Sequence, residues 1–180
     1  MTEPKGSISR PPRSKGEKLL TARESPCGMK WAAAIALVVA CQSGGKTAAP
    51  AGKLELIDAP AAAEIAPVIA TELARAEHDG KHLLVYLGAT WCEPCVKFHD
   101  AAAAGKLDGV FGDLRMLVFD ADRDNAAFER AGYKYELVPL FAIPNADGRS
   151  SGRQIEGSIK GANAVDQISP RLRALVDGTP

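Results

Sequence analysis

Two cysteines with two residues between them, Cys92 and Cys95, are the side chains whose types and spacing most directly suggest chemistry. They follow the apolar run HLLVYLGA and precede residues that favour helices. If a strand ends and a helix begins here, both sulfur atoms lie on one face of the helix, at a separation that a disulfide can span. The spacing therefore predicts a cysteine pair that closes reversibly into a disulfide.

The two cysteines have different roles in this interpretation. Cys92 lies at the helix N-terminus, where unpaired amides and the helix dipole lower the pKa of a thiol, so we expect it to be the nucleophile. Cys95, one turn further, is expected to resolve the mixed disulfide that this attack forms. Pro94 fits the first turn, where its missing amide hydrogen costs no helical bond. Glu93 adds a negative charge beside the sulfurs, which we expect to oppose thiolate formation.

A zinc site and a purely structural disulfide are the alternatives for this motif. A Cys-x-x-Cys pair is half of many zinc sites, but the sequence has no second pair and no His-x-His after it. The three histidines, His78, His82 and His99, are scattered over separate predicted elements. We therefore predict no metal site. The structural disulfide stays open, because the same helical turn would close a bond that nothing ever reduces.

The surrounding sequence alternates between predicted strands and helices. Apolar runs predict buried strands at residues 82–89, 114–121 and 138–143, and Asp147-Gly148 predicts a turn before an edge strand near 153–157. Spacing and composition predict helices at residues 61–78, 95–104, 125–131 and 162–176, the last of which is expected to kink or divide at Pro170. Asp120 and Asp122 are expected to cap the helix that follows them. This alternation predicts an α/β fold, with helices on both faces of a sheet.

The cysteine motif and one further dipeptide resemble the thioredoxin family. The resemblance is carried by Ala89-Thr90-Trp91-Cys92-Glu93-Pro94-Cys95 and, 44 residues after Cys95, by Val138-Pro139. It covers residues 57–176 and implies a thioredoxin fold, in which a central mixed β-sheet is flanked by helices. It also implies that Pro139 follows a cis peptide bond and packs against the disulfide, while the backbone of Val138 pairs with the substrate chain. Trp91 is expected to shield the sulfur and to form part of the docking face.

Two positions depart from the family pattern. Tyr86 occupies the position of the family's buried aspartate, and its phenol, with a pKa near 10, is a poor base at neutral pH. Val118 takes the position of the family's buried lysine. We therefore expect the proton of Cys95 to leave by another route, through water or Glu93. His99 lies one helical turn beyond Cys95, which makes it a candidate for a hydrogen bond near that residue.

The charge distribution weighs against a nucleic-acid-binding protein. Residues 1–30 contain seven Lys or Arg and three acidic residues, which leaves 15 basic and 19 acidic side chains in the rest of the chain. A domain that binds nucleic acid normally carries a basic patch or stripe, and the sequence after residue 30 offers none.

The N-terminal part of the chain resembles a bacterial export signal. Residues 31–40 form an apolar run that is too short to span a bilayer as a helix. Val38-Val39-Ala40-Cys41 resembles a lipobox, which implies that Cys41 carries lipid after cleavage. Alternatively, Cys41 is an ordinary cysteine within a signal peptide or a membrane anchor, and either interpretation exports the domain.

These features predict four segments along the chain. Met29 is a possible translation start, because a compact signal with one basic residue follows it. The segments are a disordered leader at 1–28, which is not translated if synthesis starts at Met29, a lipoprotein signal peptide at 29–40, a flexible tether at 41–56 and a thioredoxin-like domain at 57–180.

The sequence therefore predicts a periplasmic thiol-disulfide oxidoreductase that acts on protein substrates, needs no cofactor and is a monomer. Its expected partners are cysteine-containing envelope proteins, a membrane electron donor or acceptor, and the membrane itself through the lipid at Cys41. Two alternatives remain: a redox-inactive binding module of the same fold, and a copper(I) metallochaperone that uses both thiolates.

Overall fold

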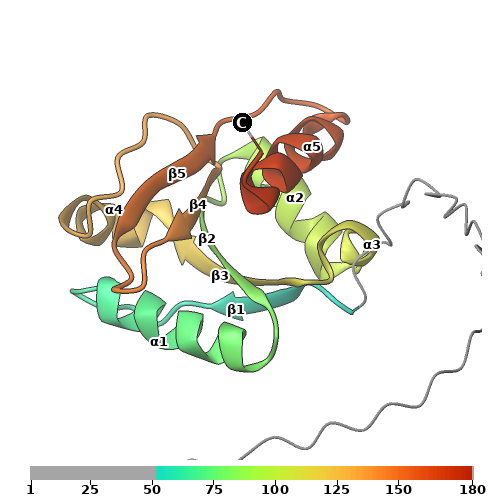
Figure 1. Cartoon of the computed structure of the whole chain (residues 1–180). Coiled ribbons are helices and arrows are strands. Elements are labelled where there is room, and N and C mark those ends of the chain that lie inside the picture. The colour runs from blue at the N-terminus through green and yellow to red at the C-terminus, as the bar shows by residue number, and fades with distance from the viewer. Residues whose placement is uncertain (1–51, 180) are drawn as a thin grey trace, which may run out of the picture. The chain divides into compact units, whose positions relative to one another are not determined.

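The computed structural model describes residues 52–179, which form a mixed five-stranded sheet between layers of helices (Figure 1). The strands are β1 (Glu55–Asp58), β2 (His82–Gly88), β3 (Leu114–Asp120), β4 (Leu140–Pro144) and β5 (Ser150–Glu156), in the spatial order β1-β3-β2-β4-β5. β3 pairs in parallel with β1 and β2, whereas β4 runs antiparallel to both β2 and β5. This topology confirms the expected thioredoxin fold, an α/β architecture on a central mixed sheet.

Helices cover both faces of the sheet, as the sequence predicts. They are α1 (Ala66–His78), α2 (Glu93–Ala103), α3 (Asp108–Phe111), α4 (Ala121–Arg130) and α5 (Ala164–Asp177). α1 and α4 pack on one face, and α2 and α5 pack on the other (Figure 1). Along β2, Leu84 and Tyr86 point into the α2 and α5 layer, while Leu83 and Val85 point into the opposite one. The strand is apolar throughout because both of its faces are buried.

The folded part begins earlier than the sequence suggests. β1 starts at Glu55 and Leu54 is buried, so the last residues of the expected tether, 41–56, belong to the domain. The backbone amide of Leu54 donates to Asp108 at the start of α3, a helix that the sequence did not predict. Both elements have four residues, which is too short for a clear periodic pattern.

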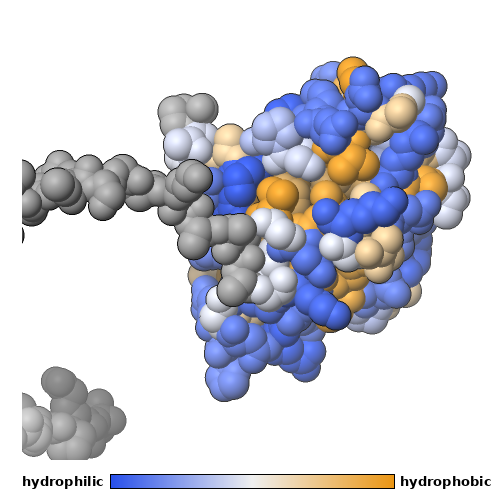
Figure 2. All heavy atoms as spheres, turned by 90° about the vertical axis from the view of Figure 1, so that its right-hand side faces the viewer, coloured by the Kyte–Doolittle hydropathy of each residue, from blue (hydrophilic) through white to orange (hydrophobic). Residues whose placement is uncertain are grey.

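Figure 2 shows the side of the molecule at the right of Figure 1, where hydrophilic side chains surround smaller apolar areas.

Two helices begin at other residues than predicted, for local reasons. α1 starts at Ala66 rather than at residue 61, and Pro67 occupies its first turn. α4 starts at Ala121 rather than at residue 125, because the carboxylate of Asp120 accepts hydrogen bonds from the amides of Asp122 and Arg123. The cap predicted for Asp120 is thus confirmed, and it lengthens the helix.

The C-terminal elements follow the predicted pattern with shifted ends. β4 starts at Leu140 instead of residue 138, and β5 starts at Ser150 instead of 153. The turn between them requires glycine at position 148, since Gly148 has φ +79° and a Cβ there would lie 2.0 Å from the carbonyl oxygen of Ala66. α5 is one helix that continues through Pro170 to Asp177, so the division expected there is not found.

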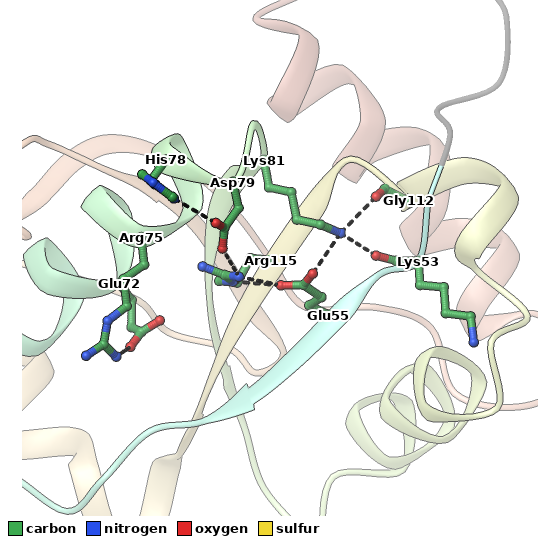
Figure 3. A network of polar contacts seen from close by, with 9 residues as sticks. All are labelled: Lys53, Glu55, Glu72, Arg75, His78, Asp79, Lys81, Gly112 and Arg115. Atoms are coloured by element: carbon green, nitrogen blue, oxygen red, sulfur yellow. Dashed lines mark hydrogen bonds and ion pairs between the residues drawn. The ribbon is translucent and has the colours of Figure 1, made fainter.

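A network of charged side chains attaches β1 to the start of the sheet (Figure 3). Arg115 of β3 donates to Glu55 at 2.8 Å and to Asp79 at 2.7 Å, and its side chain is 11% exposed. Lys81 lies 3.3 Å from Glu55 and also donates to the carbonyl oxygens of Lys53 and Gly112. Because β1 is an edge strand of four residues, these contacts supply attachment that its short ladder does not.

The predicted leader at 1–28, the signal peptide at 29–40 and the lipid site at Cys41 lie outside the described residues. Within residues 52–179, no helix is both long and apolar enough to cross a membrane.

Candidate active site

Cys92 and Cys95 lie where β2 ends and α2 begins, and they form a disulfide. Cys92 is the N-cap of α2 and has an extended backbone, while Cys95 is in the first helical turn. Their Cα atoms are 5.2 Å apart, within the range that a disulfide spans without backbone movement. The structure therefore brings the predicted pair together in the predicted place.

The environment of the two sulfur atoms is asymmetric. Cys92 is 6% exposed and Cys95 is 1% exposed, so a partner reaches Cys92 first. The sulfur of Cys92 also accepts a hydrogen bond from the backbone amide of Cys95 at 3.2 Å. After reduction, this amide and the helix N-terminus around it would stabilise a thiolate on Cys92.

The second predicted motif, Val138-Pro139, lies directly beside Cys92. The peptide bond between the two residues is cis, as the resemblance implies. The sulfur of Cys92 lies 3.6 Å from the carbonyl oxygen of Val138, a van der Waals contact because a disulfide sulfur carries no hydrogen. Val138 is partly buried and Pro139 is buried.

The loop before Pro139 is held by Glu156, which the sequence analysis missed. One carboxylate oxygen of Glu156 accepts hydrogen bonds from the backbone amides of Glu136 at 2.8 Å and Leu137 at 3.2 Å. The amide of Gly157 then donates to the carbonyl oxygen of Pro139. The carboxylate of Glu156 and these amides lie about 20 positions apart in the sequence. No local sequence pattern predicts a hydrogen bond between residues so far apart.

Trp91 is exposed and is hydrogen-bonded to the start of α4. Its side chain is 66% exposed, and its indole nitrogen donates to both carboxylate oxygens of Asp122, at 3.1 and 3.0 Å. Asp122 was expected to cap α4, but its carboxylate fixes the tryptophan. Trp91 and Val138 both line an open groove of about 660 Å³, the Trp91 groove, which is also lined by Asp122, Tyr135, Glu136 and Leu137.

Glu93 and Pro94 are the first two residues of α2. The position of Pro94 is as predicted, whereas the contacts of Glu93 reduce the effect expected of its charge. Pro94 is buried in the first turn, as predicted. Glu93 accepts a hydrogen bond from the amide of Gly161 at 3.2 Å and lies 3.7 Å from the ammonium group of Lys97. Its charge is therefore shared with Lys97, which weakens the expected effect on the sulfurs.

Tyr86 lies beneath Cys95, at the position of the family's aspartate. Its hydroxyl donates to the carbonyl oxygen of Cys95 at 3.2 Å, and burial raises the pKa of this phenol above its ordinary value. Val118 is its register partner on β3. Gly88 makes room for the phenol, because a Cβ there would lie 2.4 Å from the hydroxyl oxygen of Tyr86.

A second cavity of about 540 Å³, the Cys95 pocket, opens on the other side of the active-site helix. Its walls include Tyr86, Cys95, His99 and Val118, with Asp58 and Arg123 contributing from β1 and α4. His99 is partly exposed, and its imidazole lies 3.9 Å from the carboxylate of Asp100. The structure thus places His99 on the same cavity as Cys95, one helical turn away.

Similarity to known proteins is found among solved structures. No protein-family model matches the sequence, and no curated protein matches it. Among solved structures, the chain is similar to thioredoxins.

These similarities are distant in sequence. A mutant thioredoxin from Halobacterium salinarum is 19% identical, with 72% of this chain and 94% of that chain covered and a TM-score of 0.43. The thioredoxin of Trichomonas vaginalis is 16% identical, with coverage of 70% and 97% and a TM-score of 0.44. A poplar thioredoxin h is 20% identical, with coverage of 71% and 96% and a TM-score of 0.40.

Within the described residues, no group of three or more His, Cys, Asp or Glu side chains is arranged to hold a metal ion. The arrangement of Cys92 and Cys95 supports thiol–disulfide exchange.

Proposed function

We propose that this protein is a thiol-disulfide oxidoreductase in which Cys92 attacks and Cys95 resolves. The observation that carries the proposal is the asymmetric disulfide at the N-terminus of α2. Its more exposed sulfur, that of Cys92, faces the loop that contains the cis peptide bond before Pro139. A disulfide with a purely structural role needs neither this asymmetry nor an open groove beside it.

The reaction follows from the geometry of the pair. In the reductive direction, the thiolate of Cys92 attacks one sulfur of a substrate disulfide, and the other substrate sulfur leaves as a thiol after taking up a proton. The thiol of Cys95 then loses its proton and attacks the sulfur of Cys92. The mixed disulfide breaks, the second substrate thiol is released, and the Cys92–Cys95 disulfide forms. The oxidative direction is the same sequence in reverse.

The Trp91 groove is the proposed place for the substrate chain. Two of its lining residues adjoin Cys92, because Trp91 precedes that residue in the chain and the carbonyl of Val138 contacts its sulfur. Trp91 and Leu137 expose 66% and 59% of their surface and offer apolar contacts, while the backbone beside Pro139 offers pairing to an extended chain. The substrate class is therefore an extended protein segment that contains a cysteine.

We further propose that the domain acts outside the cytoplasmic membrane, attached through lipid on Cys41. The support is the apolar run of residues 31–40 and the lipobox resemblance that ends at Cys41. The partners would be cysteine-containing envelope proteins and a membrane protein that supplies or withdraws electrons, and the protein would act as a monomer without a cofactor. Incorporation of labelled fatty acid that persists in Cys41→Ser would refute the anchor.

Trapping of a mixed disulfide tests the proposed activity. We would use the full chain with Cys27→Ser and Cys41→Ser, so that Cys92 and Cys95 are its remaining thiols, and peptides that contain a disulfide or oxidised glutathione as partners. The added Cys95→Ser substitution should accumulate a covalent complex through Cys92, because the resolving thiol is missing.

The matched control is the added Cys92→Ser substitution, which should form little complex because Cys95 is 1% exposed. If neither variant forms a complex, while the parent still binds partner peptides without covalent bonding, the binding-module alternative replaces the enzyme. Uptake of one copper(I) ion per chain that needs both cysteines, without thiol exchange, would favour the metallochaperone instead.

A further inference from the structure

The proposed reaction requires a proton acceptor for Cys95, and the expected ones are unsuitable. The phenol of Tyr86 donates its hydrogen to the carbonyl of Cys95, and burial raises its pKa, so it does not take up a proton near neutral pH. Glu93 is bonded to the amide of Gly161 and paired with Lys97. The thiol of Cys95 itself is almost completely buried.

The Cys95 pocket supplies another route. Cys95 and His99 are four residues apart on α2, so their side chains follow one another on the same helical face. Both contribute to the wall of the pocket, which also contains Tyr86 and the backbone of Gly88. The cavity has a volume of about 540 Å³, which is large enough for several water molecules. The side chain of His99 is 41% exposed, so it also exchanges protons with solvent.

The wall of the pocket contains more acidic than basic groups. Arg123 is the basic group in the wall besides His99, and its guanidinium is already bonded to Asp124 and to the carbonyl of Ala59. The acidic groups in the wall are Asp58 from β1, Asp100 from α2 and Asp120 from the end of β3. A positive charge formed on His99 therefore faces three carboxylates and one neutralised cation.

We propose that His99 accepts the proton of Cys95, through water in the Cys95 pocket, during the resolving step. The inference rests on the proposed oxidoreductase function. The sulfur–hydrogen bond of Cys95 breaks and the imidazole becomes imidazolium; the thiolate then displaces the substrate sulfur from Cys92. The departing substrate thiolate takes up a proton from solvent, and His99 returns its own proton to solvent. An imidazole suits this role because its ordinary pKa lies near neutral pH.

The test separates the two chemical steps. The full chain with Cys27→Ser and Cys41→Ser is reduced and mixed with dithiobis(nitrobenzoate), which releases one coloured thiol when Cys92 attacks and a second when Cys95 resolves. The substitution His99→Gln should leave the first release unchanged and slow the second at least about tenfold near pH 7. The pH profile of the second release should also differ between His99→Gln and the parent, while the pH profile of the first release should not.

The control is His78→Gln, which removes an exposed imidazole at the C-terminus of α1 and should change neither step. In His99→Ala, added imidazole should restore much of the second release, because the pocket is open to solvent. The reduction potential of the cysteine pair should stay the same in all variants, since a proton carrier accelerates both directions equally.

The outcomes distinguish this inference from the proposed function. If the parent releases no coloured thiol, the oxidoreductase proposal fails. If the parent completes both steps and His99→Gln matches it in rate and pH profile, the role of His99 is refuted. A shift in potential, or equal slowing of both steps, would also refute it and indicate a general effect on the active-site helix.

Discussion

Near the first residues of β2 and β3, charged side chains form ion pairs with one another. Near the last residues of the same strands, the side chains around the disulfide are partly exposed to solvent. At the first end, Arg115 and Lys81 are engaged with carboxylates and backbone carbonyls (Figure 3). At the second end lie the disulfide, the exposed ring of Trp91 and the partly exposed imidazole of His99. The contrast shows that this chain holds its edge strand with satisfied ion pairs and leaves partly exposed side chains beside the disulfide.

The pKa values at the paired end follow from this arrangement. Burial alone would raise the pKa of Glu55, but hydrogen bonds from Arg115 and Lys81 outweigh it and hold the pKa below its usual value. Hydrogen bonds from His78 and Arg115 lower the pKa of Asp79. Both carboxylates therefore stay charged in the folded protein down to a lower pH than in the unfolded chain.

The comparison predicts that activity and stability can be changed separately, and Glu156 should show the larger effect. Glu156→Ala removes the acceptor that fixes the amides of Glu136 and Leu137, so the loop before Pro139 is no longer held against Cys92. We expect the rate of thiol exchange with a peptide disulfide to fall about tenfold, as when positioning groups are lost. Stopped-flow kinetics would measure it.

Glu156→Gln keeps an oxygen acceptor and should recover most of that rate. Glu129→Ala, which removes an exposed carboxylate of α4, should leave the rate unchanged. Equal rates in Glu156→Ala and the parent would show that the loop needs no such support.

Arg115 should show the smaller effect, and on stability instead of rate. Arg115→Met removes bonds to Glu55 and Asp79 while keeping an apolar stem of similar length. Because both partners are partly exposed, we expect a loss of about 1 kcal/mol in the free energy of unfolding at pH 7. Urea unfolding of the oxidised protein would measure it, and the exchange rate should not change.

The same variant has a predicted pH dependence. The pKa values of Glu55 and Asp79 are lower in the folded protein than in the unfolded chain, where they are about 4. The two ionised carboxylates therefore stabilise the fold above about pH 4, and this stabilisation is lost as the pH falls through their pKa values in the folded protein. The difference in stability between parent and Arg115→Met should therefore shrink below about pH 4. Arg75→Met, at an exposed pair on α1, should show almost no difference at any pH.

The sequence was sufficient for features that depend on neighbouring residues. The cysteine motif, the apolar run of β2 and the turn at Asp147-Gly148 are all local patterns, and the structure confirms each of them. Val138-Pro139 was placed through resemblance to a family, because nothing in its local sequence connects it to residues almost 50 positions earlier.

Features that depend on contacts between distant segments were missed. β1 is a strand because it pairs with β3, and its four residues carry no periodic signal of their own. The carboxylate of Glu156 and the bond between Trp91 and Asp122 join residues separated by 19 positions or more. The Cys95 pocket combines walls from five elements of structure, so its outline appears only when the chain is folded.

The central claim is that the Cys92–Cys95 disulfide opens and closes reversibly, and its reduction potential tests this most directly. The full chain with Cys27→Ser and Cys41→Ser would be equilibrated in glutathione and dithiothreitol buffers, and its free thiols tagged and counted by mass. We predict a two-electron transition between roughly −120 and −270 mV, the range of enzymes that exchange disulfides. A pair that stays oxidised in excess dithiothreitol would contradict the claim and leave a structural disulfide.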